Sequence, residues 1–240
     1  MIAQAREWLE SAASVAVLTG AGISAESGVP TFRGPGGLWR NFRPEDLATP
    51  QAFERNPQLV WEWYDWRRSL IAKAEPNAGH RALVQLEQQK RSFWLVTQNV
   101  DGLHDRAGNR RISKLHGDIW TVRCLGCGKA SRNDQVPLTT LPPRCECGGM
   151  LRPGVVWFGE MLPQQALEQA YFAAQRAQVF LVLGTSSLVY PAAALPRVAL
   201  DRGARVIEIN LEPTELSSLA QVSLRGKVGE LLPQIVTGNK

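Results

Sequence analysis

Short apolar runs alternate with helical stretches along most of this 240-residue chain, and this order restricts the fold more than any other feature. The runs are too short for helices and end at turn residues, which is typical of buried strands. We expect strands at residues 15–18, 93–97, 179–183 and 205–209. We expect helices at residues 2–13, 77–90, 164–175, 190–202 with an interruption at Pro196, and 229–236. This alternation predicts an α/β fold with a mostly parallel sheet that helices cover on both faces.

Two segments interrupt the alternation, and we interpret both as insertions that form a small second lobe. Residues 34–76 separate the first strand from the next helix by far more than an ordinary crossover, and they are rich in Trp, Arg and Pro. Residues 120–154 lack the alternation and contain all four cysteines.

The composition is that of an ordinary globular chain, with 44% hydrophobic and 20% charged residues. A net charge of +5 suits an anionic cofactor but does not establish nucleic-acid binding. The longest apolar runs are too short to span a bilayer. Glu7 and Glu10, without an apolar core near the start, argue against a secretory signal, and we expect a cytoplasmic protein.

A glycine-rich turn directly follows the first expected strand. Gly20, Ala21, Gly22 and Ile23 open a segment that fits the dinucleotide-binding pattern G-x-G-x-x-G/A. Gly20 permits a tight turn, and Gly22 lets backbone N–H groups approach a pyrophosphate. The acidic residue usually found about 20 positions later is missing. The turn therefore predicts a dinucleotide site unlike that of an ordinary dehydrogenase, with a turn that binds no ligand as the alternative.

Polar turns also follow the other three expected strands, at residues 98–104, 184–187 and 210–212. Ligands of open α/β sheets bind outside the carboxyl ends of the strands, so these turns are expected to converge with the glycine turn. Asn210 and Glu212 can bind ribose hydroxyls and supply the missing acidic function. Arg33 can reach phosphate oxygens, although a solvated surface arginine is the simpler interpretation of that residue alone.

Three histidines are candidates for a general base near neutral pH. His116 lies just before the cysteine segment, at the expected junction of the two lobes, where clefts form. A structural role is the favoured interpretation for His80, and His104 is intermediate. We therefore expect His116 to be the base.

The four cysteines form two close pairs, Cys124 with Cys127 and Cys145 with Cys147. A C-x-x-C pair followed by a second close pair is the pattern of a zinc ribbon. Four thiolates close the coordination shell of one zinc ion, so the metal is expected to be structural. An iron–sulfur centre and two local disulfides are the alternatives.

Taken together and in this order, these motifs resemble the sirtuin family over nearly the whole chain. The resemblance rests on residues 20–24, 28–33, 97–101, 116–117, the paired cysteines, and residues 156–160, 184–186 and 210–212. It implies a Rossmann-like NAD-binding domain of residues 1–33, 79–119 and 155–240, a helical insertion with the acyl pocket at 34–78, and a zinc module at 120–154. It also implies NAD-dependent removal of acyl groups from protein lysines.

The resemblance further implies how the reaction proceeds. The acyl oxygen attacks the ribose carbon that carries nicotinamide, nicotinamide leaves, and His116 takes a proton from a ribose hydroxyl. NAD is consumed, and O-acyl-ADP-ribose is released. The implied NAD-binding residues are Gly20, Ala21, Gly22, Ile23, Phe32, Arg33, Gln98, Asn99, Asp101, Gly184, Thr185, Ser186, Asn210, Leu211, Glu212 and Val228. The segment that pairs with the substrate peptide is Val156, Trp157, Phe158 and Gly159.

The segment from Trp61 to Arg68 bears on which acyl group is removed. If it is helical, Tyr64 and Arg67 are neighbours on one face, and a phenol beside a guanidinium suits a carboxylate. An arginine stacked among aromatic rings is the alternative. The segment resembles the sirtuin branch with Tyr-x-x-Arg in its pocket, and Ala48 matches the small residue of that branch. This implies desuccinylase and demalonylase activity alongside deacetylase activity.

Two other functions remain open from the sequence alone, an NAD-dependent oxidoreductase and a zinc-ribbon nucleic-acid-binding protein. The missing acid after the second strand argues against the first. The weak basic character of residues 120–154 argues against the second, so we do not expect nucleic-acid or membrane binding. Acylated-lysine proteins are the expected partners, and we expect a monomer.

Overall fold

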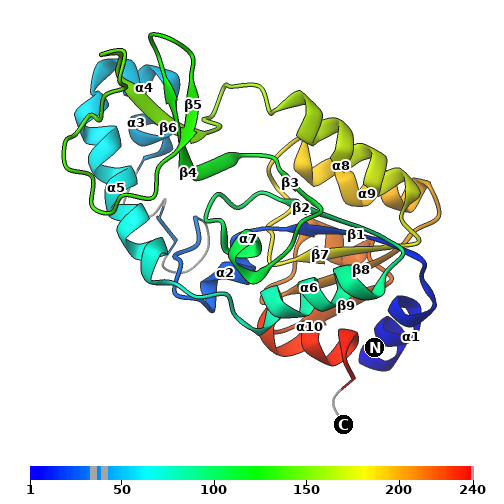
Figure 1. The fold of residues 1–240 in the computed structure, drawn as a ribbon. Coiled ribbons are helices and arrows are strands. Elements are labelled where there is room, and N and C mark those ends of the chain that lie inside the picture. Colours follow the sequence, from blue (N-terminus) through cyan, green and yellow to red (C-terminus); the bar gives the residue numbers. More distant parts are fainter. Residues whose placement is uncertain (33–36, 39–42, 239–240) are drawn as a thin grey trace.

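The computed structural model describes residues 1–32, 37–38 and 43–238. A six-stranded sheet forms its larger part, in the order β3-β2-β1-β7-β8-β9 (Figure 1). All neighbouring strands in this sheet are parallel. The strands are β1 (Ser14–Thr19), β2 (Ser92–Thr97), β3 (Ile112–Lys114), β7 (Val179–Leu183), β8 (Arg205–Asn210) and β9 (Val222–Arg225). Successive strands are added in one direction up to β3 and in the other from β7, which confirms the doubly wound α/β fold.

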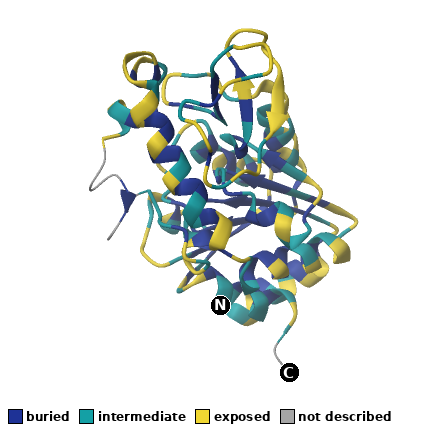
Figure 2. Cartoon of the chain, turned by 60° about the vertical axis from the view of Figure 1, so that its left-hand side comes forward, coloured by how far each residue is buried: buried dark blue, intermediate teal, exposed yellow. Residues whose placement is uncertain are grey.

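Helices cover both faces of the sheet, and the strands are buried between them (Figure 2). On β1, Val15 and Val17 pack against one helical layer, whereas Ala16 and Leu18 pack against the other. Both kinds of position are apolar because neither face is open to water. The first layer contains α1 (Ile2–Ser11), α6 (Ala78–Gln89) and α10 (Val228–Val236), and the second contains α8 (Gln164–Arg176) and α9 (Leu195–Asp201).

The expected elements differ from the structure in several places in this domain, among them the segment around Pro196. Pro196 lies in the first turn of α9, so it begins that helix instead of interrupting a longer one. Proline is tolerated there because the first backbone N–H groups of a helix have no partner within it. A separate short helix, η2 (Ala192–Ala194), precedes α9. The edge strands β3 and β9, which are only three and four residues long, were not expected from the sequence.

The small lobe combines helices from the first insertion with an antiparallel sheet in the order β5-β4-β6 (Figure 1). Its elements are α3 (Pro44–Leu47), α4 (Pro50–Arg55), α5 (Pro57–Lys73), β4 (Gly117–Cys124), β5 (Ala130–Arg132) and β6 (Leu151–Val155). Trp61 on α5 is fully buried, and its indole N–H donates to the carbonyl of Leu151 at 2.8 Å. Arg68 stacks on Trp120 and donates to the carbonyls of Asn133 and Gln135. These contacts fasten α5 to the sheet.

Among the helices of the described residues, none is both long and apolar enough to cross a membrane.

Candidate active site

The glycine turn packs against the end of a neighbouring strand so closely that no side chain fits between them. Gly20 follows β1, and Gly22 begins α2 (Gly22–Ala25). A Cβ atom on Gly20 would lie 2.7 Å from Thr185 Cβ, and one on Gly22 would lie 2.7 Å from Gly184 Cα. Gly184 itself has a φ of +59°, which favours glycine. The glycines therefore leave bare backbone at the carboxyl ends of β1 and β7.

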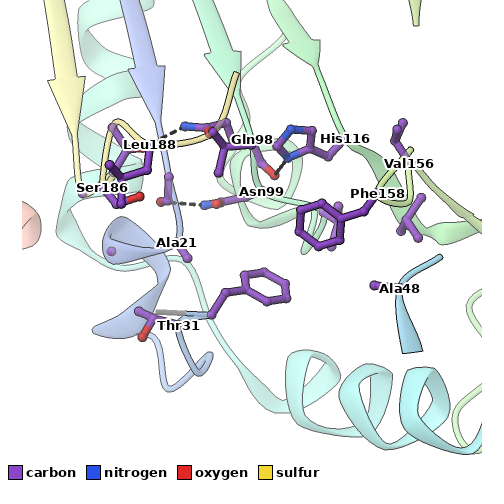
Figure 3. A pocket seen from close by; sticks show the side chains of 18 of the residues that line it. Ala21, Thr31, Ala48, Gln98, Asn99, His116, Val156, Phe158, Ser186 and Leu188 are labelled. Carbon is purple, nitrogen blue, oxygen red and sulfur yellow. Dashed lines mark hydrogen bonds between the residues drawn. The ribbon is translucent and has the colours of Figure 1, made fainter. Parts of the chain in front are cut away.

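A cavity of about 640 Å³ opens at these carboxyl ends and extends to the small lobe. Figure 3 shows Ser186 and Leu188 at one side of it and Val156, Phe158 and Ala48 at the other. Its volume lies within the usual range for ligand pockets. Of the residues expected from the sequence, it is lined by Gly20, Ala21, Gly22, Phe32, Ala48, Tyr64, Arg67, Gln98, Asn99, His116, Val156, Trp157, Phe158, Gly159, Gly184, Thr185, Ser186, Asn210, Leu211 and Glu212.

Polar side chains at the strand ends are tied to one another by hydrogen bonds. Gln98 donates to Thr185 Oγ1 at 2.9 Å, and Asn210 donates to the carbonyl of Thr185 at 3.3 Å. Asn99 donates to the carbonyl of Gly20 at 3.0 Å, which ties the end of β2 to the glycine turn (Figure 3). These hydrogen bonds therefore fix the positions of the side chains on the cavity floor before any ligand binds.

His116 lines the cavity, and one of its ring nitrogens has no hydrogen-bond partner among the described residues. Its Nδ1 lies 3.0 Å from the carbonyl oxygen of Gln98. A carbonyl only accepts, so Nδ1 carries the proton and Nε2 keeps its lone pair. Burial lowers the pKa of His116, and the hydrogen bond to Gln98 opposes this only in part. The imidazole is therefore neutral at pH 7 and able to accept a proton.

His80 and His104 are buried and do not line the cavity. His80 Nδ1 accepts the backbone N–H of Asn77 in the cap of α6, at 3.3 Å. His104, on α7 (Leu103–Ala107), lies with Nε2 3.0 Å from Thr19 Oγ1. Their pKa values are lowered mainly by burial, to about 4 for His80. Both have the contacts of structural residues.

Three expected NAD-binding residues of the described chain do not line the cavity. Asp101 lies beneath its floor, where it accepts hydrogen bonds from Ser24 Oγ and from the backbone N–H of Leu103, both at 2.8 Å. Ile23 and Val228 are buried in the core between the sheet and the layer of α1, α6 and α10. Arg33 lies outside the described residues.

The cavity wall after β8 depends on an acidic residue that the sequence analysis did not single out. Glu208 is 1% exposed and accepts hydrogen bonds from Thr214, Ser217, Ser223 and Arg225. Thr214 caps the short helix η3 (Glu215–Ser218) and lines the cavity. Glu212, expected to supply the acidic function here, is exposed at the rim.

Other residues of the cavity wall were not named as site residues from the sequence, although Thr31, Val100 and Glu160 lie in the motifs that carry the resemblance. They are Thr31, Trp63, Val100, Val155, Glu160, Leu162, Leu188, Val189, Tyr190, Pro213, Thr214 and Glu215. The apolar run 188–190 directly follows the polar turn 184–187, and that position was the available signal for its part of the wall. Trp63 carried no such signal, because an aromatic residue on a helix is usually a core residue.

Tyr64 and Arg67 share the end of the cavity that lies in the small lobe, and both come from α5. The Arg67 guanidinium lies 4.7 Å from the centre of the Phe32 ring and 4.9 Å from that of Trp63. No carboxylate of the described residues forms an ion pair with it. Burial raises the pKa of Tyr64 to about 12, so the phenol keeps its hydrogen. This end of the cavity therefore offers a cation and a neutral donor.

The four cysteines lie together at the far side of the small lobe, away from the cavity lining. All four Sγ atoms lie within 4.8 Å of one another, and two of the separations are 3.5 and 3.9 Å. Tetrahedral zinc with Zn–S bonds of about 2.3 Å requires sulfur atoms about 3.8 Å apart. Backbone N–H groups of Gly126 and Cys127 donate to Cys124 Sγ at 3.3 and 3.4 Å. The cluster therefore suits one structural zinc ion.

Comparison with known proteins decides the family. The model of the Sir2 family matches residues 20–191. An NAD-dependent protein deacylase from Aquifex aeolicus is 56% identical over 223 residues, covering 92% of this chain and 93% of that relative. The chain belongs to the Sir2 family. It is therefore an NAD-dependent protein deacylase, and sirtuin is another name for its family.

Solved structures of Sir2 homologues agree with this assignment. A Sir2 homologue in complex with NAD matches with a TM-score of 0.92 and 47% identity, covering 98% of this chain and 92% of that one. A mutant Sir2 homologue in complex with 2′-O-acetyl ADP ribose also matches with a TM-score of 0.92 and 47% identity, covering 98% and 94%. The bare backbone at the glycine turn and the volume of the cavity fit NAD as the co-substrate of this Sir2 chain.

Proposed function

We propose that this deacylase removes acetyl, succinyl and malonyl groups from protein lysines and releases nicotinamide and O-acyl-ADP-ribose. The observation that carries the acyl preference is the location of Tyr64 and Arg67 in the same cavity as His116. NAD supplies the ribose carbon that receives the acyl oxygen as nicotinamide leaves. The protein's residues bind both substrates and move the proton.

His116 is the general base of the proposal. Its neutral imidazole keeps the Nε2 lone pair for a ribose hydroxyl, while the carbonyl of Gln98 holds Nδ1–H. Gln98 and Asn99 would hold the nicotinamide and its ribose, and the backbone at Gly20–Gly22 and Gly184–Ser186 would hold the phosphates. Asn210, Leu211 and Glu212 line the cavity after β8 and would hold the adenosine ribose. Asp101, Ile23 and Val228 lie outside the cavity lining and support it from below. Arg33 is the remaining residue of the proposed NAD-binding set.

The lysine side chain enters between the segment 156–159 and the helical insertion. The backbone N–H groups of Val156 and Phe158 already donate to the carbonyls of His116 and Ala48, so an extended peptide would pair with the carbonyl side of this segment. Main-chain pairing of this kind accepts many sequences. Ala48 leaves room for the acyl chain. The distal carboxylate of a succinyl or malonyl group then meets Arg67 and Tyr64, which support it by a charge-assisted contact and a phenol hydrogen bond.

Removing the cation of the acyl pocket tests this preference. Arg67→Met keeps an unbranched apolar side chain and deletes the charge. A hydrogen-bonded charge contributes about 1.5–3 kcal/mol, so kcat/KM for a succinyl-lysine peptide should fall on the order of 10- to 100-fold. Turnover of the matching acetyl-lysine peptide should fall much less, since acetyl has no carboxylate. Mass spectrometry should detect nicotinamide and the acylated ADP-ribose for both peptides.

Arg68→Met is the matched control, because Arg68 is the next buried arginine on α5. It bonds Asn133 and Gln135 in the small lobe and does not line the cavity. The control should lower thermal stability without changing the ratio of succinyl to acetyl turnover. A loss of succinyl turnover no larger than the loss of acetyl turnover in Arg67→Met would refute the assignment of the acyl pocket.

A further inference from the structure

The indole of Trp157 bonds directly to the hydroxyl of Tyr64. Trp157 Nε1 lies 3.0 Å from Tyr64 Oη, and both side chains are buried. An indole N–H can only donate, so the phenol oxygen is the acceptor. Tyr64 lies on α5, whereas Trp157 follows β6, 93 positions later along the chain. Only the folded small lobe brings the two together.

An ion pair fixes the orientation of the Trp157 indole. Arg152 donates to both carboxylate oxygens of Glu160, at 2.6 and 2.9 Å, and its guanidinium carbon lies 3.6 Å from the centre of the Trp157 ring. Glu160 also accepts the backbone N–H of Trp157 at 2.8 Å. Phe53 packs against the indole with ring centres 5.2 Å apart. With backbone and ring both held, the indole N–H is directed at Tyr64.

The hydrogen bond from Trp157 leaves the O–H of Tyr64 able to donate to a ligand, beside the guanidinium of Arg67. A phenol has one hydrogen and two lone pairs, and Trp157 occupies one of the lone pairs. Within the described part of the chain, neither the phenol hydrogen of Tyr64 nor the guanidinium of Arg67 has a hydrogen-bond acceptor, although both residues line the cavity. Accepting a hydrogen bond also polarises the phenol O–H, which strengthens it as a donor to an anion.

We propose that Trp157 is a specificity-determining residue for acyl groups that end in a carboxylate. By donating to Tyr64, it occupies one lone pair of the phenol oxygen and strengthens the phenol O–H as a donor to a substrate carboxylate beside Arg67. An acetyl group has no carboxylate, so these two donors do not stabilise its binding. The inference rests on the proposed role of Tyr64 and Arg67.

The test removes the indole N–H and follows the ratio of kcat/KM for succinyl-lysine and acetyl-lysine peptides of one sequence. Trp157→Phe deletes the donor together with part of the ring. Benzothienylalanine at position 157 replaces only the N–H with sulfur and keeps the shape. Each change should lower the ratio about five- to tenfold, as expected for one hydrogen bond, mainly through a higher KM for the succinyl peptide. In a Tyr64→Phe background, the same changes should alter the ratio less than twofold.

The outcomes separate the two proposals. If Arg67→Met and Tyr64→Phe lower the ratio but both changes at position 157 leave it as in the wild type, Trp157 has no such role and the proposed acyl preference stands. If Arg67→Met lowers both activities equally, the acyl preference fails and the role of Trp157 fails with it. Should Trp157→Phe not fold, the benzothienylalanine variant gives the decision.

Discussion

Glu208 offers the sharpest test of how the protein builds the cofactor side of its cavity. Its buried carboxylate accepts four hydrogen bonds, three from hydroxyls and one from Arg225. The hydroxyls of Thr214 and Ser217 belong to the segment that forms the wall after β8. Glu208→Ala should therefore lower both the stability of the fold and the affinity for NAD.

The size of both effects follows from these contacts. Four hydrogen bonds to a charged group contribute about 6–12 kcal/mol together, and the desolvation of one buried carboxylate offsets several kcal/mol of this. A net loss of about 2–4 kcal/mol corresponds to a decrease in Tm on the order of 10 °C for a chain of this length. Binding of NAD would then have to order the loosened wall, at about 0.5–1.5 kcal/mol per side chain, which should raise the KM for NAD about three- to tenfold.

Thermal denaturation and steady-state kinetics at saturating peptide measure the two effects. Glu87→Ala is the matched control, because Glu87 accepts hydrogen bonds from Asn109 and from the backbone of Arg110 and Arg111 outside the cavity lining. The control should lower Tm and leave the KM for NAD unchanged. An unchanged KM in Glu208→Ala, or an equal rise in both variants, would refute this account of the wall.

The pH dependence of the same contacts has a definite sign. Burial alone would raise the pKa of Glu208, but hydrogen bonds from Ser223, Thr214 and Ser217 hold it below the ordinary value. Its contribution to stability is therefore complete above the pKa of the unfolded chain, about 4.3, and is lost as the pH falls through the lower folded value. The difference in Tm between wild type and Glu208→Ala should narrow in that acidic range.

Two further predictions concern the base and the metal. Because burial lowers the pKa of His116, kcat/KM should stay level near pH 7 and fall on acidification with a midpoint below 6.5, and a midpoint above 6.5 would contradict the assignment. His116→Tyr should abolish turnover with Tm and zinc content retained. Purified protein should contain one zinc ion per chain, and Cys145→Ser should lose the metal and unfold the small lobe at a lower temperature. Full stability after removal of the metal, measured by atomic absorption and circular dichroism, would show that zinc has no structural role.

Local patterns in the sequence predicted the α/β fold, the strands of the sheet centre and the cysteine cluster. Strands buried on both faces must be apolar at every position, so residues 179–183 were recognisable with the same bounds as β7. The two cysteines of each close pair can bind the same ion because the loop between them is short. The edge strands β3 and β9 were missed because three or four residues carry too weak a pattern.

The chemical groups at the strand ends can be predicted from the sequence, since a turn directly after a strand must lie at the edge of the sheet. Which distant residues come into contact is visible only in the folded chain. Trp157, which follows the second insertion, bonds to Tyr64 in the first insertion. Asp101 lies beneath the cavity floor and accepts a hydrogen bond from Ser24. Glu208, instead of Glu212, accepts the hydrogen bonds that fix the cavity wall after β8. These contacts join residues far apart along the chain or depend on how a loop folds back. No local sequence pattern can therefore predict them.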